Sequence, residues 1–233
     1  MTQSDYTTPR HSDMLIKVCG MKYPDNIADV AALTPMLMGF IFYEGSPRFA
    51  GNLDPESVVS LPDFVRPVAL FVNAEFDQII ATIRRYGINI VQLHGDESPE
   101  LCQRLRTQGL IVARAIAIAE PGDFARVNQY KGAVDFIVFD SKTPRHGGSG
   151  KKFDWNLLAA YDGSIPYLIG GGVGPDDVDN IVAAMRPGMM GIDLNSCFEQ
   201  LPGVKDIMLL SKFILTLRKN NEDDTPAKPF WEK

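Results

Sequence analysis

Two residues of this sequence have side chains suited to proton transfer, and each ends an apolar run of the chain. Cys19 ends the run Leu15–Cys19, and Asp140 ends the run Val134–Asp140. A thiol with an ordinary pKa of about 8.5 is only slightly ionised at neutral pH, but its thiolate is a good base or nucleophile. An aspartate in a partly desolvated site can retain a proton and act as an acid. Taken singly, Cys19 is more often a buried small hydrophobic residue, and Asp140 is as often a capping residue.

Several polar or glycine residues after other apolar runs are candidates for substrate binding. Arg48 offers a planar fork suited to a carboxylate, although most arginines are solvated surface charges. The run Gly170–Gly172 and the pair Asn195-Ser196 could bind a phosphate through backbone N–H groups, although glycine also serves ordinary turns. His94 has no obvious partner in the sequence and is interpreted first as a structural histidine. The substrate-binding candidates are therefore Arg48, His94, Gly171, Gly172, Asn195 and Ser196.

Eight short apolar runs, bounded by Gly, Pro, Asn or Asp, alternate with segments of helical spacing. The runs are Leu15–Cys19, Met36–Phe42, Pro67–Val72, Asn89–Leu93, Ile111–Ile118, Val134–Asp140, Pro166–Gly170 and Met189–Leu194. Continuous apolar strands that alternate with helices indicate a parallel sheet, because parallel connections need a crossover helix. Eight such units predict an α/β fold, a single-domain (β/α)₈ barrel. An open doubly wound sheet is the alternative, but it usually has fewer strands and a dominant Gly-rich turn near the N-terminus.

Proline beside an acidic residue marks several of the predicted helix starts, as at Pro24-Asp25, Pro99-Glu100 and Pro175-Asp176. This pairing suits the first turn of a helix, where proline needs no hydrogen bond and the acid complements the dipole. The last helix is predicted over Lys205 to Leu217. In such a barrel the active-site residues follow the C-terminal ends of the strands. Cys19 and Asp140 should therefore lie at the same end, which favours a functional pair.

Composition limits the class of protein and its partners. The 233 residues carry 23 Lys and Arg against 29 Asp and Glu, a net charge of −6, and 45% are hydrophobic. This mildly acidic balance argues against nucleic acid or an anionic membrane as a partner. No stretch approaches the ~18 apolar residues of a membrane span. Three cysteines without CxxC spacing favour a reducing, cytoplasmic location, and three histidines without HxH or HExxH spacing argue against a metal.

The predicted barrel occupies residues 15–219, with an N-terminal extension over 1–14 and a C-terminal tail over 220–233. No linker rich in Ser or Gly divides the barrel. The glycine-rich loop Gly147–Gly150 is interpreted either as a lid or simply as a long loop, and long loops in compact barrels favour function. We expect a monomer or a homodimer.

The sequence resembles phosphoribosylanthranilate isomerase of tryptophan biosynthesis over nearly its whole length, from about Leu15 to Leu217. The stretches that carry the resemblance are Ile16–Met21, Gly39–Phe42 followed by Ser46–Arg48, Val91–Gly95, Phe139–Thr143 with Gly147–Trp155, and the glycine-rich turn before Pro175. Several motifs coincide in chain order, so the likeness is not confined to one short pattern.

The resemblance implies an Amadori rearrangement of N-(5′-phosphoribosyl)anthranilate to 1-(o-carboxyphenylamino)-1-deoxyribulose 5-phosphate, a small phosphosugar, without a metal or organic cofactor. It implies that Cys19 is the general base, Asp140 the general acid and Arg48 the partner of the anthranilate carboxylate. The sequence departs from the family at Asn195-Ser196-Cys197, where Ser-Gly is usual, and at Ser141, where Thr is common. We expect Cys197 to be a packed, unreactive thiol turned away from the phosphate.

Two other functions remain as alternatives at this point. Another phosphosugar barrel, such as indole-glycerol-phosphate synthase or a ribulose-phosphate epimerase, could share the phosphate site, but it would use Lys and Glu or a metal in place of Cys19 and Asp140. A barrel that serves only as a binding or scaffold module would tolerate loss of this pair. A length of 233 residues leaves no room for a fused second barrel, so we expect a monofunctional protein.

Overall fold

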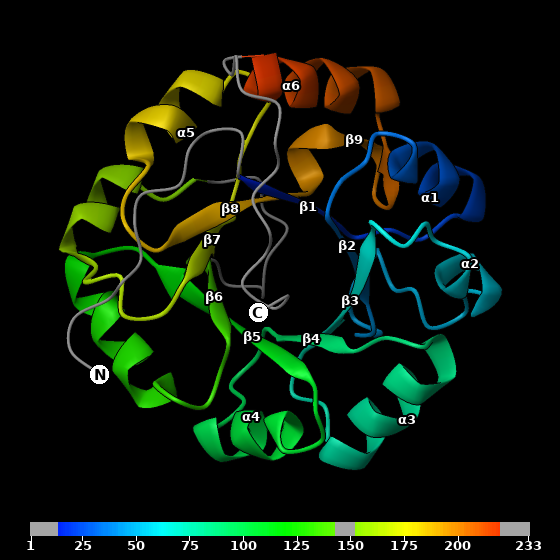
Figure 1. Cartoon of the computed structure of the whole chain (residues 1–233), viewed down its shortest axis with the longest axis horizontal. Helices are drawn as coiled ribbons and strands as arrows, with labels where there is room; N and C mark the ends of the chain where they lie inside the picture. Colours follow the sequence, from blue (N-terminus) through cyan, green and yellow to red (C-terminus); the bar gives the residue numbers. More distant parts are fainter. Residues whose placement is uncertain (1–13, 143–151, 220–233) are drawn as a thin grey trace.

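The computed structural model describes residues 14–142 and 152–219, and eight parallel strands close into a barrel in chain order (Figure 1). The strands are β1 (Leu15–Cys19), β2 (Leu37–Ile41), β3 (Arg66–Phe71), β4 (Ile90–Leu93), β5 (Ile111–Ile118), β6 (Phe136–Ser141), β7 (Tyr167–Ile169) and β8 (Met189–Leu194). The ring closes where β1 pairs with β8, which places Lys17 beside Asp193. The predicted (β/α)₈ fold is confirmed, and each of the eight apolar runs forms a strand.

Helices surround the barrel and connect its strands, as Figure 1 shows. The α-helices are α1 (Pro24–Ala31), α2 (Glu56–Val59), α3 (Phe76–Tyr86), α4 (Pro99–Arg106), α5 (Val178–Ala184) and α6 (Ile207–Lys219), and the 3₁₀ helices are η2 (Pro121–Tyr130), η3 (Trp155–Ala160) and η4 (Ser196–Phe198). Pro24 and Pro99 occupy first-turn positions, and the Ser98 hydroxyl caps α4 at the Leu101 N–H. The predicted starts of these helices are confirmed.

The start predicted for the last helix is wrong. Lys205 belongs to β10 (Val204–Lys205), which pairs antiparallel with β9 (Glu199–Leu201), and the helix begins at Ile207. Gly203, at φ +87°, turns the chain between the two strands. Each strand is too short for its alternation to be recognised in the sequence. Asn26 of α1 fixes this hairpin, because its amide exchanges hydrogen bonds of 3.0 and 2.7 Å with the backbone of Lys205.

Side chains alternate between the barrel interior and the helix layer along each strand. On β1, Ile16 and Val18 face outward into the large core between strands and helices. Leu15 faces inward and packs with apolar residues of the neighbouring strands, namely Leu37, Val68, Ile90, Ala113, Phe136 and Leu168. The same alternation turns Lys17 and Cys19 into the barrel, so an apolar strand places a cation and a thiol above this inner core.

The segments predicted to flank the barrel fall almost entirely outside the described residues. The described chain begins at Met14, which is buried in the core, and it ends at Lys219, the last residue of α6. The extension and the tail therefore stay predictions. Within residues 14–142 and 152–219, no helix is long and apolar enough to cross a membrane.

Candidate active site

Cys19 lies at the C-terminal end of β1, almost fully buried, with 2% of its surface exposed. A Cβ atom added to Gly39 of β2 would come within 2.6 Å of the Cys19 sulfur, so the absence of a side chain there makes room for the thiol. Ile41 and Leu70 pack beside it. Burial raises the pKa of the Cys19 thiol, and the charge of Lys17 acts against this increase. The thiol therefore needs nearby positive charge to act as a base.

Asp140, on β6, faces His94, which follows β4. Nε2 of His94 lies 3.1 Å from Oδ2 of Asp140, and Oδ1 of Asp140 accepts a 2.7 Å hydrogen bond from the Ser141 N–H. The amide nitrogen of Gln92 lies 3.4 Å from the other ring nitrogen of His94. The sequence offered no partner for His94, and the structure supplies the carboxylate of the candidate acid.

Gly171 and Gly172 follow β7 with φ of +65° and +77°, the left-handed region that favours glycine. A Cβ atom on Gly171 would come within 2.7 Å of Oδ1 of Asp140 and would collide with the backbone nitrogen of Ser141. The Ser141 hydroxyl also donates to the carbonyl oxygen of Gly171 at 3.3 Å. Gly171 thus packs directly against the candidate acid. Phosphate binding by this turn stays a prediction.

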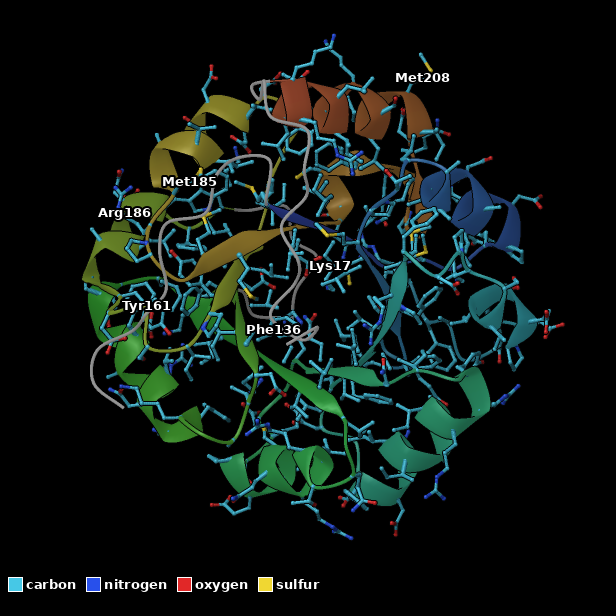
Figure 2. All side chains as sticks on the ribbon, viewed as in Figure 1. Lys17, Phe136, Tyr161, Met185, Arg186 and Met208 are labelled. Atoms are coloured by element: carbon cyan, nitrogen blue, oxygen red, sulfur yellow. The ribbon has the colours of Figure 1, made fainter. Side chains whose placement is uncertain are left out.

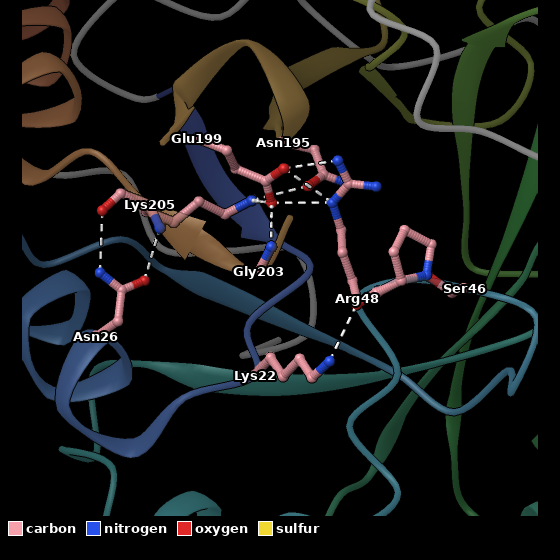
Figure 3. A network of polar contacts seen from close by, with 9 residues as sticks. Lys22, Asn26, Ser46, Arg48, Asn195, Glu199, Gly203 and Lys205 are labelled. Carbon is pink, nitrogen blue, oxygen red and sulfur yellow. Dashed lines mark hydrogen bonds and ion pairs between the residues drawn. The ribbon is translucent and has the colours of Figure 1, made fainter. Parts of the chain in front are cut away.

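Arg48, in the loop after β2, is buried and held by the carboxylate of Glu199 (Figure 3). Nε and Nη2 of Arg48 donate to Glu199 at 2.9 and 2.6 Å. Lys205 donates to the same carboxylate at 2.7 Å and to Oδ1 of Asn195 at 2.8 Å. Burial would raise the pKa of Glu199, but the hydrogen bonds from Arg48 and the charge of Lys205 outweigh it and lower the pKa. Arg48 is therefore not a solvated surface charge.

The cluster of Arg48, Glu199 and Lys205 joins two basic side chains to one carboxylate, and burial lowers the pKa of the Lys205 ammonium group although Glu199 acts against this decrease. Glu199 uses Nε and Nη2 of the Arg48 guanidinium, so Nη1 remains as a donor for an anionic group. Gly20, at φ +81°, allows the cluster to approach β1. A Cβ atom there would come within 2.6 Å of Cδ of Arg48 and 2.7 Å of Oδ1 of Asn195. The glycine after Cys19 therefore brings Arg48 close to the candidate base.

The predicted phosphate residues after β8 lie beside this cluster. The side chain of Asn195 is engaged by Lys205, and Ser196 begins η4. Cys197 is half-buried and packs against the core, and its φ is not positive. Burial raises the pKa of its thiol. This placement agrees with the expected packed thiol, while contact of Asn195 and Ser196 with a phosphate stays a prediction.

Four charged residues at or near the site were not recognised from the sequence: Lys17, Asp193, Glu199 and Lys205. The first two had a usable signal, because a charged side chain at an inward position of an apolar strand must find a buried partner. Glu199 and Lys205 had none, since the hairpin that holds them was not predicted.

Two further sequence predictions concern a metal ion and a lid loop. Within the two described ranges, no group of three or more His, Cys, Asp or Glu side chains is arranged to hold a metal ion. The loop Gly147–Gly150, the candidate lid, lies outside the described residues.

The fold and the site together define the class of the protein. It is a (β/α)₈ barrel that gathers, at and beside the C-terminal ends of its strands, a buried thiol, a histidine–carboxylate pair and an arginine held by a carboxylate. The family model for N-(5′-phosphoribosyl)anthranilate isomerase matches residues 16–216, and the chain belongs to this family.

Relatives and solved structures are similar over most of the chain. It is 43% identical over 203 residues to the N-(5′-phosphoribosyl)anthranilate isomerase of Parabacteroides distasonis. This match covers 86% of this chain and 92% of the relative. The crystal structure of the phosphoribosylanthranilate isomerase of Thermotoga maritima has a TM-score of 0.78 at 31% identity and covers 89% of this chain and 100% of that one. Another crystal structure shows a phosphoribosylanthranilate isomerase in complex with reduced 1-(o-carboxyphenylamino)-1-deoxyribulose 5-phosphate. It has a TM-score of 0.75 at 28% identity and covers the same shares of the two chains.

Proposed function

We propose that this phosphoribosylanthranilate isomerase of tryptophan biosynthesis performs its Amadori rearrangement with Cys19 as general base and Asp140 as general acid. The observation that carries the proposal is their placement at one end of the barrel. Cys19 lies buried at the end of β1, and Asp140 is held by His94 and the Ser141 N–H near the end of β6. An isomerisation of this kind needs one acid and one base that act on the same sugar.

Ring opening and the removal of the C2 proton each involve one proton transfer with the enzyme, and together they leave the enzyme with an unchanged number of protons. Asp140 protonates the furanose ring oxygen, the bond from this oxygen to C1 breaks, and the nitrogen lone pair forms the C1=N bond of a Schiff base. The Cys19 thiolate then takes the proton of C2, the electrons of that C–H bond form a C1=C2 double bond, and nitrogen regains its lone pair. The enolamine becomes the ketone when C1 gains a proton and the C2 hydroxyl loses one.

The remaining site residues bind the two anionic ends of the substrate. Arg48 contacts the anthranilate carboxylate with the part of its guanidinium that Glu199 does not use. The backbone N–H groups near Gly171, Gly172, Asn195 and Ser196 hold the phosphate. His94 holds Asp140 toward the sugar.

We also propose a cellular location, a partner and an oligomeric state for the enzyme. Cys19, Cys102 and Cys197 are all free thiols, which suits a cytoplasmic enzyme. The partner is the small phosphosugar substrate, and the protein acts as a monomer or homodimer.

The test follows the fluorescence of phosphoribosylanthranilate with purified protein and no added metal. We expect the fluorescence to fall when the wild-type protein is present and to fall very little with Cys19→Ser or with Asp140→Asn. Full activity in both variants would contradict the proposed roles.

A further inference from the structure

Lys17 is a fully buried cation inside the barrel, and the two proton-transfer steps do not use it. Its side chain is 0% exposed, and Figure 2 places it near the centre of the barrel. It precedes Cys19 by two residues on β1, so both side chains point inward. A buried ammonium group is costly unless charged or polar partners surround it. Its partners therefore indicate what it does.

The first partner is Asp193, which lies beside Lys17 in the pairing of β1 with β8. Nζ of Lys17 lies 2.7 Å from Oδ2 of Asp193. An ammonium group has three donors, and this contact uses one of them. In the described part of the chain, Oδ1 of Asp193 is buried without a hydrogen-bond partner, so the carboxylate is not saturated either. The pair is held firmly but leaves donors of Lys17 for a second group.

The second partner is Cys19. Burial raises the pKa of the Cys19 thiol, and the charge of Lys17, two residues earlier on the same inward face of β1, lowers it. Asp193 acts in the opposite direction, and Lys205 of β10 adds a smaller attraction. From β2 and β3 the neighbours of the thiol are uncharged, namely Gly39, Ile41 and Leu70.

We propose that Lys17 is the positioning residue for the general base, and that its ammonium group stabilises the Cys19 thiolate while Asp193 limits that effect. Among the described residues, Cys19 is almost fully buried and packs with Ile41 and Leu70, and Lys17 is the basic residue on the same inward face of β1. The inference rests on the proposed role of Cys19. It also explains why a strand otherwise made of apolar residues carries a lysine two positions before the thiol.

The experiment compares the ionisation of Cys19 in the wild type, Lys17→Met and Asp193→Asn. Ultraviolet absorbance of the thiolate is recorded against pH, and the curve of Cys19→Ser is subtracted to remove Cys102 and Cys197. Methionine keeps an unbranched side chain without charge. We expect Lys17→Met to move the titration to higher pH by about one unit, a ~10-fold smaller thiolate fraction near neutrality. Asp193→Asn should move it to lower pH.

Kinetics provide the second measurement. The acid limb of kcat/KM should shift in the same direction as the thiol titration, so Lys17→Met should regain activity as the pH is raised. A role limited to packing would reduce activity equally at every pH. Unchanged titration curves in folded Lys17→Met would overturn the inference.

A second variant covers the case in which Lys17→Met leaves Asp193 unpaired and does not fold. Lys17→Met/Asp193→Asn removes both charges, and its titration is compared with that of Asp193→Asn. The difference should again be a shift to higher pH, and no difference would overturn the inference. Activity retained by Cys19→Ser would instead refute the proposed role of Cys19. An inactive Cys19→Ser with an unmoved thiol titration in the Lys17 variants would refute this inference alone.

Discussion

At the scale of single residues, the chain contains three free cysteines in different settings, and only Cys19 lies at the end of a barrel strand. We predict that Cys19→Ser removes nearly all turnover and leaves the fold intact, because serine has a similar volume but a hydroxyl too weakly acidic to act as the base. General-base catalysis contributes about 10²–10⁴-fold, so kcat should fall at least that far. Steady-state kinetics measure it, with Cys197→Ser as the matched control. A Cys19→Ser enzyme with half its kcat would refute the assignment.

Asp140 is the residue whose proton opens the sugar in the proposed reaction. We predict that Asp140→Asn abolishes turnover, since an amide cannot donate this proton. In the wild type, kcat/KM should fall on both sides of an optimum. One limb should report the base becoming protonated and the other the acid losing its proton. Such apparent values belong to the acid–base pair as a whole. A flat profile with rate-limiting chemistry would contradict the pairing.

Arg48 is predicted to recognise the anthranilate carboxylate, and its geometry makes a conservative replacement harmful. Arg48→Lys replaces the planar fork held by Glu199 with a point charge, so KM should rise, and Arg48→Ala should raise it further. Glu199→Gln should also raise KM, because it loosens the fork while retaining Arg48. Substrate titrations in steady state measure these changes. An unchanged KM in both Arg48 variants would leave the arginine a structural role only.

At the scale of elements, the turn after β7 positions the end of β6. Gly171→Ala should lower kcat strongly, because the added methyl group would displace Asp140 and Ser141 in addition to straining a φ of +65°. Gly109→Ala is the matched control, since Gly109 has a φ of +79° and no atom within 4 Å of the added methyl group. We expect Gly109→Ala to lower the melting temperature modestly and to retain kcat. Equal kcat losses in the two variants would show that backbone strain alone is responsible.

At the scale of the whole molecule, carboxylates with lowered pKa values link stability to pH. Burial would raise the pKa values of Glu199 and Asp177, but contacts with Arg48, Lys205 and Lys152 outweigh it, and both pKa values are lowered. Their contribution is therefore complete above the unfolded values, which are 4.5 for glutamate and 3.8 for aspartate, and it is lost as the pH falls through the folded values.

We predict that the free energy of unfolding, measured with urea, declines as the pH falls below about 4.5. Glu199→Gln should be less stable than the wild type at neutral pH and should lose less stability on acidification, because it has no carboxylate to protonate. Glu56→Gln, at an exposed position of α2, is the control and should follow the wild type. A Glu199→Gln curve parallel to that of the wild type would contradict this linkage.

The sequence by itself predicted the barrel, because eight apolar runs alternating with helix starts are local patterns that indicate parallel strands covered by helices, and an open sheet usually has fewer strands. It also indicated Cys19 and Asp140, since both end such runs and parallel strands end on the same side. The sequence did not indicate that Gly20 and Gly171 have a positive φ, or which atoms leave no room for a Cβ atom there. Those atoms belong to residues that are distant in the sequence.

Only the tertiary structure decided which charged groups meet. Lys17 and Asp193 lie 176 residues apart in the chain, and Arg48 and Glu199 lie 151 apart. The pairing of β1 with β8 brings Lys17 and Asp193 together, and the β9–β10 hairpin places Glu199 beside Arg48. Short strands have no periodicity strong enough to predict, and a buried ion pair depends on partners that no local pattern contains. The candidate acid and base were therefore indicated by the sequence, whereas the charged residues near them came together only when the barrel closed.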